Sequence, residues 1–124
     1  MIAADTSVLI DYFQGKMNTQ TEKLDEVFTY HSLVLPPVVL AEILSDPLLP
    51  KKFIEKIEEL PILELTKNFW QRAGMNRSKL ISKKLKARLA DTLIAQSCID
   101  NQVPLITRDS DFQHFAKYCG LMLF

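Results

Sequence analysis

Short, wholly apolar runs alternate along the chain with longer segments in which apolar residues recur at spacings of three and four. The apolar runs are typical of buried strands, and the spacing of three and four is typical of amphipathic helices. This alternation continues from end to end, without a linker, a repeat or a low-complexity segment. We therefore expect strands at residues 1–4, 33–35, 62–65, 104–107 and 121–124, and helices at residues 8–15, 19–30, 37–44, 53–60, 67–86, 89–100 and 109–118.

Strands that are apolar on both faces predict a parallel sheet covered by helices on both sides. The expected fold class is α/β, a three-layer sandwich in which a central parallel sheet of about 4–5 strands is flanked by helices. The 124 residues form one predicted domain, long enough to bury a core without disulfide or metal support. Cys98 and Cys119 lack the spacing of metal ligands and are predicted to be free thiols in apolar surroundings.

Neither the hydrophobic pattern nor the first residues predict a membrane or secreted protein. No apolar run approaches the roughly 18 residues that a membrane span requires. The first residues lack the basic start and the cleavage site of a secretory signal peptide. We therefore expect a cytoplasmic protein with no membrane partner.

The charges cancel over the whole chain but are unevenly distributed. Fifteen basic residues balance fifteen acidic ones, which taken alone argues against a nucleic-acid partner. Between residues 66 and 90, however, there are eight basic residues and no acidic one, so the rest of the chain carries 7 − 15 = −8. Such a segment predicts a surface that binds phosphates if its cations share one face, and the alternative is an ordinary solvated helix.

Four carboxylates lie at strand ends or in apolar helices, where an acidic side chain is unusual and requires an explanation. Asp5 and Asp109 follow predicted strands and so lie at the carboxyl edge of the sheet, where α/β proteins bind ligands. Glu42 and Asp91 lie in helices that are apolar on nearly all sides, and we expect both to point inward. A buried carboxylate needs a compensating charge, which either an arginine or a metal ion can supply.

Helix capping is the simpler explanation for Asp5, Asp91 or Asp109 taken singly. It does not explain Glu42 in the middle of an apolar helix. Convergent carboxylates without a pair of histidines or cysteines suit Mg²⁺ or Mn²⁺, which prefer oxygen ligands. Such ions activate water for phosphodiester cleavage, a reaction in which the basic segment would hold the nucleic acid.

Four segments, in order and in spacing, resemble the PIN-domain family, in particular the VapC-type toxins of type II toxin–antitoxin systems. The likeness extends over essentially the whole chain. The segments are residues 2–10 (IAADTSVLI), 41–44 (AEIL), 89–95 (LADTLIA) and 105–112 (LITRDSDF).

The resemblance implies a PIN fold and a Mg²⁺- or Mn²⁺-dependent endoribonuclease. It implies that Asp5 and Asp91 are the firmest metal ligands, that Asp109 binds directly or through water, and that Glu42 is a ligand or positions the attacking water. It also implies a cognate antitoxin as partner and a homodimer. Further positions that match the family are Asp111, a variable acidic position of open role, and Ser7 and Thr107, which would orient carboxylates.

Within the basic segment, we expect four cations to bind flanking RNA phosphates: Lys83, Lys84, Lys86 and Arg88. A PIN domain that binds RNA without cutting it is the main alternative function. A receiver-like signalling module is a weaker one, because Asp5 stands alone after the first strand and an arginine, not a lysine, follows Thr107.

The aromatic residues of two predicted helices complete the picture. We expect Phe69 and Trp70 to belong to the core, with a place in a dimer or antitoxin groove as the alternative for some of these apolar residues. We expect Phe112, Phe115 and Tyr118 to form one packed helix face, and base stacking is an alternative that the sequence does not place above packing.

Overall fold

The computed structural model describes all 124 residues and confirms the α/β fold with a parallel sheet. Three strands, β1 (Ile2–Ala4), β2 (Leu33–Val34) and β3 (Leu105–Ile106), pair in the order β2-β1-β3. Both pairings are parallel, with Ala3 opposite Val34 on one side and opposite Leu105 on the other. All residues of these strands are buried, as their uninterrupted apolar sequences require.

The sheet has three strands rather than the predicted 4–5. Residues 62–65 and 121–124 add only one bridge each at the two edges, Leu35 with Ile62 and Leu105 with Leu123, both parallel. In the first of these segments only Leu63 is buried, and the second begins after the left-handed Gly120. Segments that bury one side chain each have little reason to extend their pairing further.

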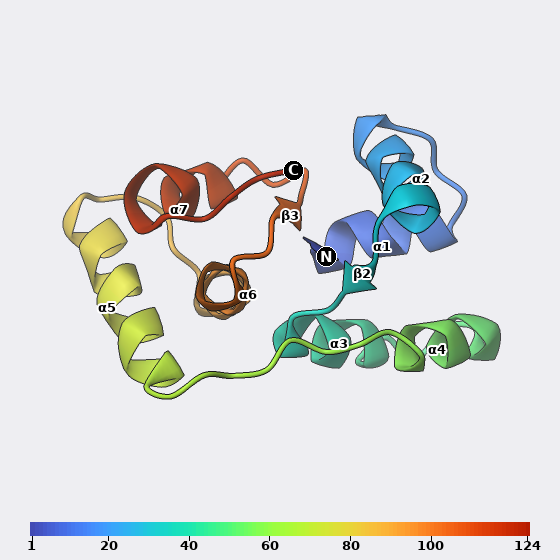
Figure 1. The fold of residues 1–124 in the computed structure, drawn as a ribbon, viewed down its shortest axis with the longest axis horizontal. Coiled ribbons are helices and arrows are strands. Elements are labelled where there is room, and N and C mark those ends of the chain that lie inside the picture. The colour runs from blue at the N-terminus through green and yellow to red at the C-terminus, as the bar shows by residue number, and fades with distance from the viewer.

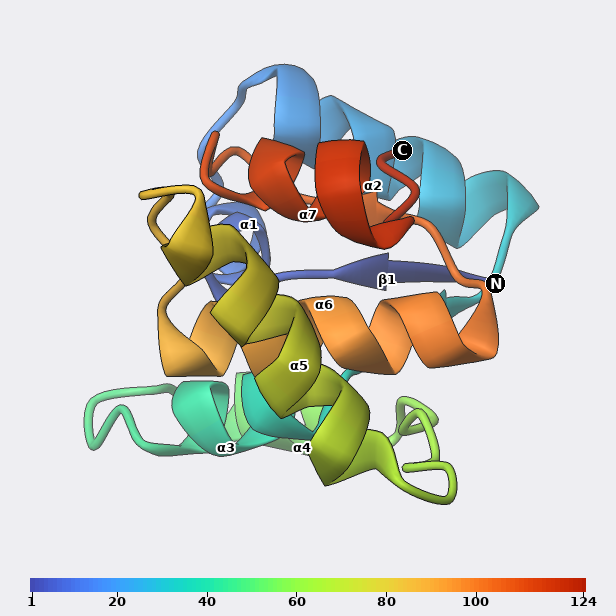
Figure 2. The ribbon, with the colours of Figure 1, turned by 90° about the vertical axis from the view of Figure 1, so that its left-hand side faces the viewer.

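Seven helices surround this sheet: α1 (Thr6–Phe13), α2 (Thr19–Tyr30), α3 (Pro37–Leu44), α4 (Lys51–Glu58), α5 (Phe69–Ser82), α6 (Leu89–Asn101) and α7 (Phe112–Cys119). Figure 1 shows α1 and α2 on one side of the strands and α5, α6 and α7 on the other, with α3 and α4 below, and Figure 2 shows α6 running alongside β1. Helix α5 crosses one end of the molecule, against α6 and α7 (Figure 1). No helix is long and apolar enough to cross a membrane.

Two helices differ in length from the prediction. Helix α5 continues through Gly74 but ends at Ser82 instead of residue 86, because Lys84 adopts a left-handed conformation with φ of 61°. Helix α7 begins at Phe112 instead of residue 109, because the Asp109 carboxylate accepts a hydrogen bond from the Asp111 backbone N–H and forms a turn there. Both changes place polar residues in loops at the carboxyl edge of the sheet.

The core contains most of the predicted residues, with one clear exception. Phe69, Phe112 and Phe115 are buried, but Trp70 is 63% exposed and packs only edge-on against Phe69. The expectation that Trp70 belongs to the core is therefore wrong: neighbouring helix positions face different directions, and only one of the two can face α6. Both cysteines are free, Cys98 buried and Cys119 half-buried.

Candidate metal centre

The four predicted carboxylates line one cavity at the carboxyl edge of the sheet. Asp5 follows β1, Asp109 lies just beyond β3, and α3 and α6 bring Glu42 and Asp91 to the same place. Because β1 is the central strand and its two neighbours lie on opposite sides, this is the point of an α/β sheet at which a cleft opens. The cavity has a volume of about 130 Å³ and is lined by Asp5, Thr6, Ser7, Glu42, Asp91, Ile94, Asp109 and Phe112.

Asp5 combines helix capping with a place in the cavity. Its Oδ1 accepts hydrogen bonds from the Val8 backbone N–H and the Ser7 hydroxyl, both at 3.1 Å, and its Oδ2 accepts one from the Thr107 hydroxyl. Burial raises the pKa of Asp5, and these hydrogen bonds offset part of that rise. The expected orienting contacts of Ser7 and Thr107 with a carboxylate are thus present.

Asp91 lies in the first turn of α6 and has less support than Asp5. Its Oδ2 is buried without any hydrogen-bond partner. Burial raises the pKa of Asp91 to about 6, and the neighbouring carboxylates, Asp109 first among them, add to the rise against the opposing charge of Arg88. A bound cation would therefore supply the partner that this carboxylate oxygen lacks.

Asp109 and Asp111 complete a group of acidic side chains around Asp91. These three aspartates each offer one carboxylate oxygen, and the three oxygens lie within 4.8 Å of one another. Asp111 also forms an ion pair with Lys86 at 3.5 Å, which joins the basic segment to this group. The resemblance gave Asp111 no definite role, and the geometry brings it closer to Asp91 and Asp109 than its variable position suggested.

Glu42 differs from its expected environment. The prediction that it points into the core is wrong, because the residue is exposed at the rim of the cavity. It accepts a hydrogen bond from the Thr6 hydroxyl at 2.8 Å. Helix α3 is apolar on nearly all sides, but not all of its apolar residues are buried: Leu44 is 40% exposed. The sequence pattern therefore overstated the burial of this helix.

These residues fit a hard divalent cation. All the available donors are carboxylate or hydroxyl oxygens, as Mg²⁺ and Mn²⁺ require. The unpartnered Oδ2 of Asp91 and the three clustered aspartates carry negative charge that Lys86 and Arg88 offset only in part. Asp5 would contribute through oxygens whose orientation Ser7 and Thr107 already fix.

Ion pairs between a buried carboxylate on α1 and two exposed cations were not predicted. Asp11 on α1 is 2% exposed, and its Oδ2 pairs with the guanidinium of Arg108, while Lys16 lies at 3.5 Å from its other oxygen. Thr107 and Arg108 thus hold both ends of α1, through Asp5 and Asp11. Asp11 interrupts an apolar helix as Glu42 does, and this signal could have identified it.

The four cations assigned to RNA are exposed on and beside one short loop, but not every cation of the basic segment is free. The guanidinium of Arg72 makes two hydrogen bonds to the Asp100 carboxylate, at 2.6 and 3.1 Å. Arg77 donates to the Ala87 carbonyl at 2.8 Å. These two arginines therefore stabilise the fold, and among the four cations assigned to RNA Lys86 is paired with Asp111.

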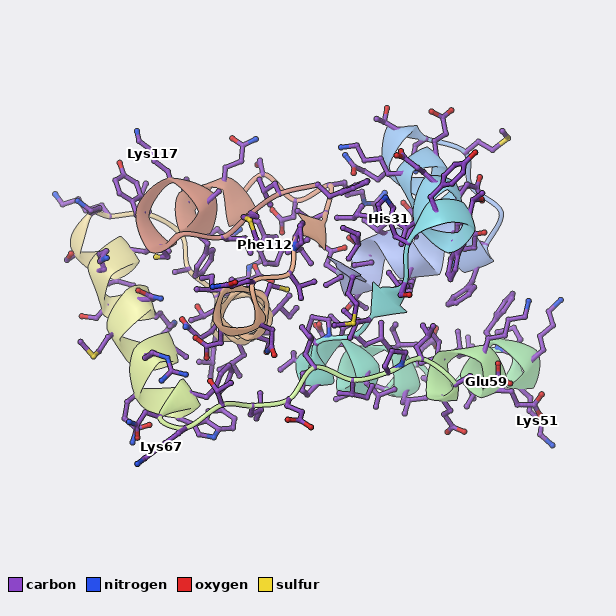
Figure 3. The ribbon with its side chains drawn as sticks, viewed as in Figure 1. His31, Lys51, Glu59, Lys67, Phe112 and Lys117 are labelled. Atoms are coloured by element: carbon purple, nitrogen blue, oxygen red, sulfur yellow. The ribbon has the colours of Figure 1, made fainter.

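A larger and more apolar groove lies apart from the acidic cavity. It has a volume of about 600 Å³ between α1, α2 and α4, and aromatic side chains line most of it. The rings of Phe13 and Phe53 stack at 4.9 Å across it, and Figure 3 shows Glu59 on its α4 side. Its lining residues are Tyr12, Phe13, Phe28, Phe53, Lys56, Glu59 and Leu60.

The fold is a three-layer sandwich with a parallel sheet, and a cavity lined by carboxylates lies at the carboxyl edge of that sheet. Comparison with protein families identifies the class to which this fold and cavity belong. The model of the PIN domain matches residues 2–118, and the chain belongs to the PIN-domain family. None of the curated proteins compared with the chain matches it in sequence.

Solved structures with a similar fold come from toxin–antitoxin systems. A chain of VapBC2 from Rickettsia felis, bound to a promoter DNA fragment, aligns with a TM-score of 0.73 and 20% identity, over 100% of this chain and 98% of that one. FitAcB from Neisseria gonorrhoeae gives 0.73 and 18%, over 100% and 96%. VapBC-5 from Mycobacterium tuberculosis gives 0.71 and 19%, over 99% and 96%. The neighbours are thus VapC and FitB toxins, and at these identities the likeness establishes the fold.

Proposed function

We propose that this protein is a Mg²⁺- or Mn²⁺-dependent endoribonuclease and the toxin of a toxin–antitoxin pair. The observation that carries the proposal is the environment of Asp91, a carboxylate with a buried, unpartnered oxygen beside Asp109 and Asp111. Charge that is left uncompensated in this way is costly for a fold and is typical of a functional site. Membership in the PIN-domain family supports nuclease chemistry at that site.

Each carboxylate has a definite task in this proposal. Asp91, Asp109 and Asp5 hold the cation, and the hydroxyls of Ser7 and Thr107 keep Asp5 in place. Asp111 remains next to the site through its pairing with Lys86. A bound divalent ion supplies a water of lowered pKa and offsets charge on the phosphate oxygens.

Glu42 is suited to positioning the attacking water. One of its oxygens accepts the Thr6 hydroxyl hydrogen, which fixes the carboxylate at the rim of the cavity. The residue is exposed, so a water molecule reaches it freely. Lys83, Lys84, Lys86 and Arg88 would hold the flanking phosphates through charge, which contributes affinity without reading sequence.

Cleavage and simple binding of RNA are separated by metal dependence. The purified protein should cleave cellular RNA with Mg²⁺ or Mn²⁺, and a chelator should stop the reaction. Asp5→Ala protein, prepared in the same way, controls for contaminating nuclease, and sequencing of the new 5′ ends after brief induction gives the target. Metal-independent RNA binding without cleavage would favour the non-catalytic PIN domain instead.

The partner in this proposal is a cognate antitoxin, and the aromatic groove supports it. The neighbours from Rickettsia felis and Mycobacterium tuberculosis are VapBC complexes. A groove of about 600 Å³ walled by aromatic rings suits an amphipathic segment of such a protein. Co-expression with the neighbouring reading frame should give a stable complex, and Phe53→Asp should weaken it.

We also propose that the toxin is a homodimer. Large apolar side chains stand exposed away from the groove, among them Trp70 at 63%, Met75 at 72% and Leu48 at 86%. These side chains support a dimer where they form one contiguous patch, which is the feature typical of an interface. Light scattering on the purified protein should give twice the mass of the chain, and Trp70→Glu should lower it.

A further inference from the structure

The end of α7 gathers lysines around one aromatic ring. The Lys83 ammonium lies 4.8 Å from the centre of the Tyr118 ring, and the Lys117 ammonium lies 5.2 Å from it. Lys79 donates to the backbone carbonyl of the same tyrosine at 3.3 Å. Three cations from two helices and the end of a loop therefore converge on Tyr118.

None of these three lysines has an acidic partner. The ion pairs of the molecule involve Lys16, Arg72, Lys86 and Arg108, and the pair nearest to this cluster is that of Lys86 with Asp111. Like charges that converge without an acidic partner repel one another, so an anion is the expected ligand. Figure 3 shows Lys117 directed away from the body of the molecule, where such a ligand has access.

We propose that Tyr118, with Lys83 and Lys117, forms a subsite for single-stranded RNA in which a base stacks on the tyrosine ring and phosphates bind the lysines. Aromatic rings interleaved with cations are the usual means of holding single strands. Phe112 and Phe115 are buried, whereas Tyr118 packs against the core and is only partly buried, so it is the phenyl ring of this helix with surface left for stacking. An ammonium–ring contact is weaker than stacking of a base, so a base can displace a lysine toward the adjoining phosphate.

The subsite lies close to the proposed cleavage site. Lys83 and Lys86 are three residues apart, so their backbones are separated by at most about 10 Å. Lys86 pairs with Asp111 beside the acidic cavity, whereas Lys83 lies over Tyr118. One loop thus joins the metal centre to the tyrosine, so a single RNA strand can contact both.

Charge at the end of a helix explains only part of this arrangement. Lys117 lies in the last turn of α7, and Lys79 donates to a carbonyl there, so both are stabilised by the helix dipole. Lys83 is the C-cap residue of α5 and is stabilised by the dipole of its own helix, but this does not explain why its ammonium lies over the Tyr118 ring. The inference rests on the proposed function, because it assigns the tyrosine to the same RNA.

The test is RNA binding measured in the cleavage-deficient Asp5→Ala background. The probe is a fluorescein-labelled oligouridine, and inorganic polyphosphate serves as an anion without bases. Tyr118→Ala should raise the Kd for oligouridine about tenfold and change that for polyphosphate much less, while Tyr118→Phe keeps the affinity. Lys83→Met and Lys117→Met should each reduce the salt slope of log K by about 0.7.

The chain offers matched controls on the opposite side of the molecule. Tyr30 on α2 is exposed at 77%, and Lys52 on α4 lies 5.1 Å from the Phe53 ring, the same lysine–ring geometry. Tyr30→Ala and Lys52→Met should leave both the Kd and the salt slope unchanged. Equal effects of Tyr118→Ala and Tyr30→Ala would overturn the subsite while leaving the proposed nuclease intact.

Photocrosslinking of the unsubstituted Tyr118 keeps the test decisive if Tyr118→Ala unfolds. Oligouridine that carries 5-bromouridine should crosslink to the peptide containing Tyr118, identified by mass spectrometry. Crosslinks confined to other peptides would reject the subsite. Absence of any RNA binding by the Asp5→Ala protein would overturn this inference together with the proposed function.

Discussion

Helix α6 carries one aspartate near each end, and the two lie in opposite environments. Asp91, in the first turn, has a buried oxygen without a partner. Asp100, in the last turn, accepts hydrogen bonds from Arg72, Gln96 and Thr66. The Asp91 carboxylate therefore lacks a partner for one of its oxygens, whereas both oxygens of Asp100 accept hydrogen bonds.

The pKa values of the two aspartates move in opposite directions, and the helix dipole is not the reason. Burial raises the pKa of Asp91 to about 6. Burial also raises the pKa of Asp100, but the hydrogen bonds and charge of its partners outweigh it and leave that pKa below its usual value. The dipole favours an acid at the start of a helix and disfavours one at its end, which is the reverse of what is seen. The hydrogen-bonding and charged partners of each aspartate therefore decide the direction of its pKa shift.

The comparison shows how one helix serves both the fold and the site. Asp100 and Arg72 fasten α6 to α5, so the basic segment is anchored at its beginning. Its far end then lies free to bring Lys86 to Asp111. The hydrogen-bonded Asp100 at the end of α6 stabilises the structure. This stability offsets the cost of the unpartnered Asp91 carboxylate at the start of the helix.

The largest expected effect is on cleavage. Asp91→Asn should reduce the rate by about a thousandfold or more, equal to ~4 kcal/mol of lost transition-state stabilisation, because it removes a charged metal ligand. The measurement is Mg²⁺-dependent cleavage of total RNA. Asp100→Asn is the matched control and should change the rate by less than about tenfold. Equal losses in the two variants would mean that Asp91 acts through the fold alone.

A divalent cation should stabilise the protein through Asp91. At a Mg²⁺ concentration of about 100 times its Kd, the free energy of unfolding should rise by about 2.7 kcal/mol. Urea unfolding with and without MgCl₂ measures the gain. The Asp100→Asn protein should show the same gain and the Asp91→Asn protein little of it. A full gain in Asp91→Asn would place the ion elsewhere.

At the satisfied end, the expected effect is on stability. Asp100→Asn should lower the free energy of unfolding by about 1–2 kcal/mol, because the amide loses charge-assisted hydrogen bonds from Arg72. The folded-state pKa of Asp100 lies below the ordinary 3.8, so its stabilisation is complete above about pH 4 and is lost as pH falls through the lower value. Urea unfolding from neutral to acid pH should therefore show the two proteins converging below about pH 4. A difference independent of pH would point to packing instead of charge.

The sequence predicted the strands of the sheet better than its edges. β1, β2 and β3 are buried on both faces, so their apolar runs were unambiguous. The edge segments at 62–65, which includes Glu64, and 121–124 form one bridge each, because pairing at an edge depends on neighbours that the local pattern does not contain.

The site was predicted from position more reliably than from burial. Asp5 and Asp109 were placed by the rule that strand ends meet, and they line one cavity as expected. The inward direction of Glu42 was wrong, since a helix with an apolar sequence can still expose some of its residues, as Leu44 shows. The pairing of Arg72 with Asp100 was also invisible, because it joins residues far apart in the chain.

The smallest expected effect is a change in the free energy of unfolding that is opposite in sign to that of Asp100→Asn. In the metal-free protein, Asp91→Asn should increase the free energy of unfolding at neutral pH by about 1 kcal/mol, a value reduced for the partial exposure of the side chain. The folded-state pKa of about 6 lies above the ordinary 3.8, so the cost of the charge is complete above pH 6 and disappears as pH falls toward 4.

Urea unfolding with a chelator, at about pH 7 and about pH 4, measures this difference. The asparagine variant should be the more stable protein at the higher pH, and the two should be equal at the lower one. A less stable variant at neutral pH would mean that the favourable place of Asp91 at the start of α6 outweighs its unpartnered oxygen. A more stable variant that no longer cleaves RNA would show that this carboxylate is kept for its chemistry at the expense of the fold.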